Sequence, residues 1–213
     1  GVGTNYTDYV INPIHAAVAV MAAVRHKRRT GEGQLIDMSQ LESSVSGMAG
    51  ALFAWDNGQM SYQRTGNRVP YAAPHGAFLA NEAGDRADHW VALACMTDDH
   101  WISLTEVMGS TELATDPRFH TLEDRKSNED NLDNIVSEWI RDMNAPDAMN
   151  QLQSAGIPAG MVQKASEVLH DPHLAAREFY AYPDHSEAGK RAYDGAGFRL
   201  SETPHEVRGA APL

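Results

Sequence analysis

Hydrophobic positions recur along the chain at two spacings, and the two spacings alternate. Apolar residues three or four positions apart, the period of a helix, fill 14–24, 41–55, 101–108 and 125–143. Short apolar runs typical of strands fill 34–38, 77–81, 90–95 and 159–163. Further short helices are expected at about 146–154, 166–170 and 172–178, followed by a loop with a few extended pieces. Helical segments therefore outnumber strands but alternate with them. This pattern predicts an α/β fold with a small α+β module in its middle.

Boundary residues refine the first predicted helix. Asn12 is placed to cap its N-terminus, and Pro13 suits the first helical position. The run of basic residues at 25–29 precedes Thr30-Gly31, and cations in a last turn complement the helix dipole. Residues 1–9 are therefore expected to form a loop that leads into this helix.

Similar signals mark the later elements. Ser39 and Glu42 have the spacing of a capping box and predict a second helix that reaches Trp55. Asp116-Pro117 predicts another helix start. The turn-rich stretch 58–74 predicts a domain boundary.

Composition narrows the functional classes. The chain has 213 residues, of which 42% are hydrophobic and 22% charged, as in soluble globular proteins. Its net charge of -12 disfavours general binding to nucleic acid or to an anionic membrane surface. No nucleic-acid or membrane partner is expected.

The single cysteine, Cys95, excludes an intrachain disulfide and a cysteine-based zinc site, and favours a cytoplasmic location. His170 and His173 lack an acidic partner at ligand spacing, so no metal is expected. The chain starts with Gly1 and stops without a closing element at Leu213. We interpret it as a fragment that lacks an N-terminal part and the extreme C-terminus.

Asp8 is the first candidate for chemistry. It lies four residues before Asn12, where unpaired backbone N–H groups and the helix dipole favour a carboxylate. Carboxylates serve as covalent nucleophiles in several enzyme classes. By position alone, Asp8 is either such a nucleophile or a helix-entry residue with local hydrogen bonds.

Several short segments carry a family resemblance when they are taken in chain order. They are Tyr6-Thr7-Asp8-Tyr9, Arg29-Thr30-Gly31-Glu32-Gly33-Gln34-Leu35-Ile36-Asp37-Met38-Ser39, Pro74-His75-Gly76-Ala77-Phe78, Asp116-Pro117-Arg118-Phe119, Ala155-Gly156-Ile157-Pro158-Ala159-Gly160 and Leu200-Ser201-Glu202-Thr203-Pro204. Together they resemble the family III CoA-transferases of the formyl-CoA and carnitine CoA-transferase (CaiB/BaiF) type.

The resemblance implies an activity. Asp8 would attack an acyl-CoA, form an aspartyl-CoA thioester and pass the CoA to a carboxylic acid. Acyl-CoA and the acid would be the substrates, with no permanently bound cofactor. His75 and Gly76 would belong to a loop near the substrate. The CoA-binding residues would lie in the missing N-terminal part.

The resemblance also implies an architecture. Residues 1–65 would be the helical C-terminal part of a Rossmann-like large domain, carrying the nucleophile. Residues 66–154 would form a small α/β domain, and 155–213 a returning linker segment. Two such chains would interlock as a homodimer.

Two other functions remain open. The α-methylacyl-CoA racemases share this fold and place an aspartate at the matching point, although Tyr9 directly after Asp8 is closer to the transferases. A non-catalytic or truncated subunit is the second alternative, and the intact Asp8 speaks against it. Neither the acyl donor nor the acceptor can be identified from these residues.

Overall fold

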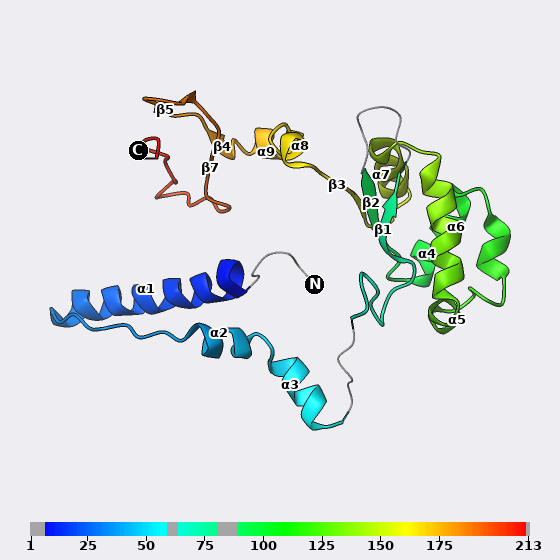
Figure 1. Ribbon diagram of the computed structural model, residues 1–213, viewed down its shortest axis with the longest axis horizontal. Coiled ribbons are helices and arrows are strands. Elements are labelled where there is room, and N and C mark those ends of the chain that lie inside the picture. The colour runs from blue at the N-terminus through cyan, green and yellow to red at the C-terminus, as the bar shows by residue number, and fades with distance from the viewer. Residues whose placement is uncertain (1–6, 59–63, 81–88, 212–213) are drawn as a thin grey trace. The chain divides into compact units, whose positions relative to one another are not determined.

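A computed structural model describes residues 7–58, 64–80 and 89–211 (Figure 1). The chain divides into two compact units, Gly1–Gly66 and Asn67–Leu213. The division lies inside the turn-rich stretch 58–74. Residues 82–88, which separate the strands predicted over 77–81 and 90–95, lie outside the described residues.

The described part of the first unit is helical. A π-helical turn, η1 (Thr7–Ile11), leads directly into α1 (Asn12–Thr30), and α2 (Gln40–Ser46) and α3 (Ala49–Asp56) follow. The predicted end of α1 is confirmed: Gly31 has a left-handed φ of 83° and donates its backbone N–H to the carbonyl of Lys27.

The predicted start of α1 is wrong. Thr7 to Tyr9 are helical rather than part of a loop, and Asn12 is not the capping residue. A capping residue usually has extended backbone, whereas Ile11, directly before Asn12, has helical angles of φ -71° and ψ -54°. The chain therefore enters α1 through a wider helical turn, and Asn12 is buried within the helical run.

Two further predictions for the first unit are wrong. Residues 34–38 form no strand, because no neighbouring strand among the described residues supplies hydrogen bonds, and Leu35 is 92% exposed. The second helix is broken into α2 and α3 at Gly47-Met48. At Gly47 a Cβ atom would lie 2.7 Å from Cδ1 of Ile11, so the glycine permits a close approach of α2 to η1.

A three-stranded antiparallel sheet organises the second unit. Its strands are β1 (His75–Leu79), β2 (Trp90–Ala94) and β3 (Ala159–Val162), in the order β1-β2-β3. Ala92 of β2 lies opposite Ala77 on one side and Gly160 on the other. The third strand thus comes from the segment that the resemblance assigns to the returning linker.

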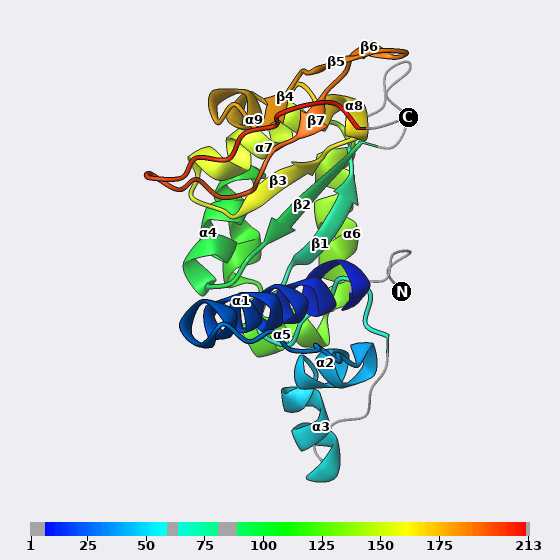
Figure 2. The same ribbon diagram turned by 90° about the vertical axis from the view of Figure 1, so that its left-hand side faces the viewer.

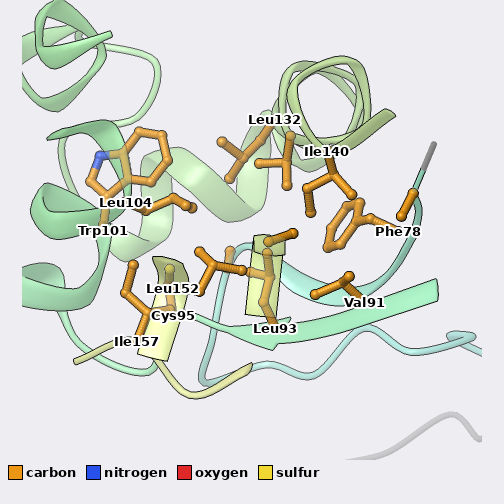
Figure 3. Close-up of a cluster of buried hydrophobic side chains, with 14 of the residues drawn as sticks. Phe78, Val91, Leu93, Cys95, Trp101, Leu104, Leu132, Ile140, Leu152 and Ile157 are labelled. Atoms are coloured by element: carbon orange, nitrogen blue, oxygen red, sulfur yellow. The ribbon is translucent and has the colours of Figure 1, made fainter. Parts of the chain in front are cut away.

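Helices cover one face of this sheet (Figure 2). Of these, α6 (Glu129–Arg141) and α7 (Ala145–Ser154) contact the strands directly. Helix α4 (Asp98–Val107) packs against α7 and against a 3-10 turn, η2 (Thr111–Thr115), while α5 (Leu122–Ser127) packs against α6. Figure 3 shows the resulting core, in which Phe78, Val91 and Leu93 of the sheet face Leu132 and Ile140 of α6. The other face of β2 remains exposed at Trp90 and Ala92.

The helical region after α4 differs from its prediction in two places. The single helix expected over 125–143 is broken at Asn128 into α5 and α6. Asp116-Pro117 starts no helix, because the Asp116 carboxylate accepts hydrogen bonds from Arg118 instead. The helix begins after Thr121, whose side chain forms a capping box with Asp124.

The C-terminal region contains short elements, as predicted. Helices α8 (Ala165–Val168) and α9 (Pro172–Ala176) follow β3. Four two-residue strands then pair as β4 (Tyr180–Ala181) with β7 (Tyr193–Asp194), and β5 (Asp184–His185) with β6 (Gly189–Lys190).

A buried arginine joins these layers. The side chain of Arg125 is 1% exposed, and its guanidinium donates to the carbonyls of Ala73 and Phe119 and to the carboxylate of Asp98, at 2.9, 3.2 and 2.6 Å. It also lies 5.7 Å from the centre of the Trp101 ring. One side chain therefore connects the entry to β1 with α4 and α5.

We expect Arg125→Met to lower the free energy of unfolding by about 3 kcal/mol, because the buried carbonyls lose their donors. Urea denaturation of the full-length protein, followed by tryptophan fluorescence, measures the change. Arg118→Met is the matched control, since its ion pair with Asp116 is exposed. Equal midpoints for the two variants would contradict this assignment.

Candidate functional site

Asp8 lies in the first turn of a helical run that continues through α1. The structure describes its backbone, within η1, but not its side chain. The first backbone N–H groups of a helix have no partner within the helix, and they create a partial positive charge there. The position is therefore one where a carboxylate is stabilised. π-helical turns also occur frequently at functional sites.

His75 and Gly76 lie in a strand, not in the loop that the resemblance implies. They are the first two residues of β1 and are paired in register with Ala94 and Leu93. A Cβ atom on Gly76 would lie 3.4 Å from the Phe78 ring, so Gly76 lies on the same, core-facing side of this strand as Phe78. Their contact with a substrate remains a prediction.

A hollow of about 350 Å³ lies beside these two residues. Its floor is made of small residues, including Ala77, Ala92 and Gly160, while Asn67 and His75 contribute polar groups to its edge. His75 is the only titratable side chain among the described residues that line it. The hollow is thus a mainly apolar surface with one imidazole.

The imidazole of His75 has a defined orientation. Its Nδ1 lies 2.5 Å from the backbone carbonyl oxygen of Asn67. A carbonyl oxygen can only accept a hydrogen bond, so Nδ1 carries the proton. The other ring nitrogen, Nε2, has no hydrogen bond to a residue that the structure describes. Nε2 is therefore available to a ligand.

Arg68 fixes the segment that supplies this carbonyl. Its guanidinium contacts the carboxylates of Asp130 and Asp133 on α6 at 2.7 and 2.6 Å. The hydrogen bond to Asp133 is the main cause that raises the pKa of Arg68. Burial raises the pKa of Asp133 and outweighs the opposing effect of Arg68. Asn67 therefore directly precedes Arg68, whose side chain is fixed by its two ion pairs.

Asp8 and His75 belong to different units, and each is described within its own unit. The sequence identified both residues, but it missed the roles of Asn67 and Arg68. No local pattern marks either of them, because their partners lie 8 and more than 60 positions away in the chain.

The described residues give little support to a metal site, a membrane-spanning helix or a nucleophilic cysteine. They contain no group of three or more His, Cys, Asp or Glu side chains that could hold a metal ion. None of the helices described is long and apolar enough to cross a membrane. Cys95 is buried, and burial raises the pKa of its thiol to about 12, which opposes a nucleophilic role.

Comparison with known proteins identifies the family. The family model for CoA-transferase family III matches residues 1–213, the whole chain. The chain belongs to this family, in agreement with the resemblance carried by its motifs.

Individual relatives found in the comparison are also named CoA-transferases. The chain is 31% identical over 214 residues to a succinyl-CoA:mesaconate CoA-transferase of Haloarcula hispanica, covering 100% of this chain and 50% of the relative. It is 28% identical over 197 residues to a succinyl-CoA–D-citramalate CoA-transferase of Chloroflexus aurantiacus, covering 92% and 48%. The chain thus spans about half the length of these curated relatives.

A solved structure supports the α/β fold. A CaiB/BaiF family protein from Brucella suis superposes with a TM-score of 0.83 at 25% identity, covering 100% of this chain and 53% of that protein. The mixed arrangement of helices and strands is therefore shared with this family.

The state of Cys95 can be tested directly. Because a pKa near 12 leaves almost no thiolate at about pH 8, we expect iodoacetamide to modify Cys95 at least about a thousandfold more slowly than glutathione. Mass spectrometry of the Cys95 peptide measures the rate. Denaturing urea should remove the difference, whereas rapid labelling of the native protein would contradict the burial.

Proposed function

We propose that the full-length protein moves CoA from an acyl-CoA to a carboxylic acid, with Asp8 as the covalent nucleophile. The main support is the family match over the whole chain. Within that match, Asp8 occupies the first turn of a helical run, where a reactive carboxylate is stabilised.

The proposed reaction has four balanced steps. A carboxylate oxygen of Asp8 attacks the thioester carbonyl, and CoA leaves as a thiolate, which gives a mixed anhydride. The thiolate then attacks the Asp8 carbonyl carbon and releases the donor acid, leaving an aspartyl-CoA thioester. The acceptor carboxylate attacks this thioester and expels the CoA thiolate, which gives a second mixed anhydride. The thiolate then attacks the acceptor acyl carbon of that anhydride, forms the new acyl-CoA and releases the Asp8 carboxylate. Asp8 is regenerated as a carboxylate.

The helix terminus supports this chemistry in two ways. Its partial positive charge stabilises the attacking carboxylate of Asp8. Its backbone N–H groups can also stabilise the oxyanion that forms when a carbonyl is attacked. Since one thioester replaces another, the exchange needs no external energy source. A covalent carrier divides the exchange into easier steps.

The proposal extends to substrates and assembly. CoA takes part as a substrate, with no permanently bound cofactor. The acids named for the two relatives, succinate, mesaconate and citramalate, are short dicarboxylic acids, so this class is the first to test. A homodimer in the cytoplasm is part of the same proposal and follows from the family resemblance.

The decisive experiment looks for the covalent intermediate. We expect full-length protein incubated with succinyl-CoA to carry CoA on the Asp8 peptide, and hydroxylamine to convert that residue to a hydroxamate. Mass spectrometry detects both products. Asp8→Asn should abolish the adduct and lower CoA transfer by at least about a thousandfold, because the nucleophile is lost.

Asp56→Asn is the matched control, since Asp56 is an exposed carboxylate at the end of α3. It should retain both adduct and activity. Absence of any adduct over a panel of acyl-CoAs, together with entry of solvent deuterium at the substrate α-carbon, would replace the transferase by a racemase. Absence of both signals would support a non-catalytic subunit.

A further inference from the structure

A hollow of about 560 Å³, separate from the one beside His75, lies in the C-terminal region of the second unit. It forms where residues 177–179, at the end of α9, meet residues 195–205, after β7. The pairing of β4 with β7 brings these segments together (Figure 1). Beside this pair, Gly195 donates its backbone N–H to the carbonyl of Phe179 at 2.8 Å. A Cβ atom on Gly195 would lie 2.5 Å from that carbonyl oxygen, so the close approach requires glycine.

Glu178, which lines this hollow, has a backbone conformation that favours glycine. Its φ is 50°, and no other non-glycine residue that the structure describes has a positive φ. The N–H groups of Glu178 and Phe179 donate to the carbonyls of Ala175 and Leu174, which is the pattern of a Schellman motif. Glycine is the usual residue at the left-handed position of that motif. The helix end thus does not require a glutamate, and residues held in such strained conformations cluster at binding and active sites.

Three basic side chains line the same hollow, those of Arg177, Arg199 and His205. None of them forms a hydrogen bond or an ion pair with a residue that the structure describes, and neither does the carboxylate of Glu178. The chain as a whole has a net charge of -12, so two guanidiniums without a carboxylate partner form a local concentration of positive charge. A concave surface with such a charge attracts anions. The planar fork of arginine matches the oxygens of a phosphate group.

The remaining wall of the hollow is largely apolar. Phe198 is 62% exposed and Leu200 is 51% exposed, and Pro204 lies in the same wall. An exposed aromatic ring can stack on the face of a planar heterocycle. The carboxylate of Glu178 can accept hydrogen bonds from hydroxyl groups, as acidic residues do from ribose in dinucleotide sites. The hollow therefore offers a partner for each part of a nucleoside phosphate.

We propose that this hollow is a binding site for a free nucleoside phosphate. Arg177 and Arg199 bind the phosphate group, and the ring of Phe198 stacks on the base. Glu178 accepts hydrogen bonds from the ribose. The volume lies within the range of about 300–1,000 Å³ that is usual for sites of small molecules. All of these residues belong to the second unit, and the site does not depend on the proposed CoA transfer.

Isothermal titration calorimetry of the full-length protein with AMP tests the site. We expect a Kd for AMP below about 1 mM, and at least about tenfold weaker binding of adenosine and of inorganic phosphate, because each supplies only part of the contacts. Arg177→Gln and Arg199→Gln should each weaken AMP binding at least about tenfold, because charge-assisted hydrogen bonds are lost. Arg191→Gln is the matched control, since Arg191 is exposed and does not line the hollow.

The stacking contact has its own pair of variants. Phe198→Leu should weaken binding of AMP at least about fivefold and leave binding of inorganic phosphate unchanged, because only the base loses its partner. Tyr182→Leu is the control, since Tyr182 is 55% exposed and lies outside the lining of the hollow.

Glu178→Gly separates ligand binding from folding. Glycine relieves the left-handed conformation, so the thermal unfolding midpoint of the free protein should stay the same or rise. Affinity for AMP should nevertheless fall about fivefold, because the ribose loses its acceptor. The variant should also lose the preference of the wild type for AMP over 2′,3′-dideoxy-AMP. An unchanged preference would exclude the assigned role of Glu178.

Three results would overturn the site. They are no binding of AMP, equal affinity for AMP and inorganic phosphate, and AMP binding that the variants of Arg177, Arg199 and Phe198 leave unchanged. CoA also contains a nucleoside phosphate, so its Kd is measured in the same variants. An unchanged Kd for CoA supports a site for free nucleotides. A Kd for CoA that rises by the same factor as that for AMP would assign the hollow to CoA and overturn the proposal.

Discussion

The second unit depends on the requirement that a buried cation be fully hydrogen-bonded. Arg125 is almost completely inaccessible to solvent, so its guanidinium must find acceptors within the protein. Three of them are backbone carbonyls, at Ala73, Phe119 and His120, and a fourth is the carboxylate of Asp98. These contacts fix where the chain enters β1 relative to α4 and α5. Packing of Leu132 and Ile140 against the sheet then builds the core.

The same arrangement fixes the residues that precede β1. Because Arg125 holds Ala73 and Arg68 holds the segment next to Asn67, the residues before β1 have little freedom. His75 is oriented from this segment through its Nδ1–H. A preorganised group loses less entropy when a ligand binds than a mobile one. Hydrogen bonds in the helical layer thereby help to set the orientation of His75.

The first unit has a different energetic character. Among its described residues only Asn12 and Ser43 are buried, while large apolar side chains such as Met21, Leu35 and Phe53 are exposed. Such a segment has little hydrophobic driving force of its own. The chain also spans about half the length of its curated relatives. The proposed nucleophile thus lies in the unit with the least internal packing.

Local sequence determined the helical and strand segments of the second unit, the C-terminal stop of α1 and the family, because periodicity, capping residues and ordered motifs are short-range signals. Among its failures are 34–38, where the apolar run has no strand neighbour within the described residues, and Asn128, where one helical period continues across a break. Only the tertiary structure placed His75 beside Asn67 and Gly160 opposite Ala92. These contacts depend on strand pairing and on buried hydrogen bonds between distant residues, which no local pattern encodes.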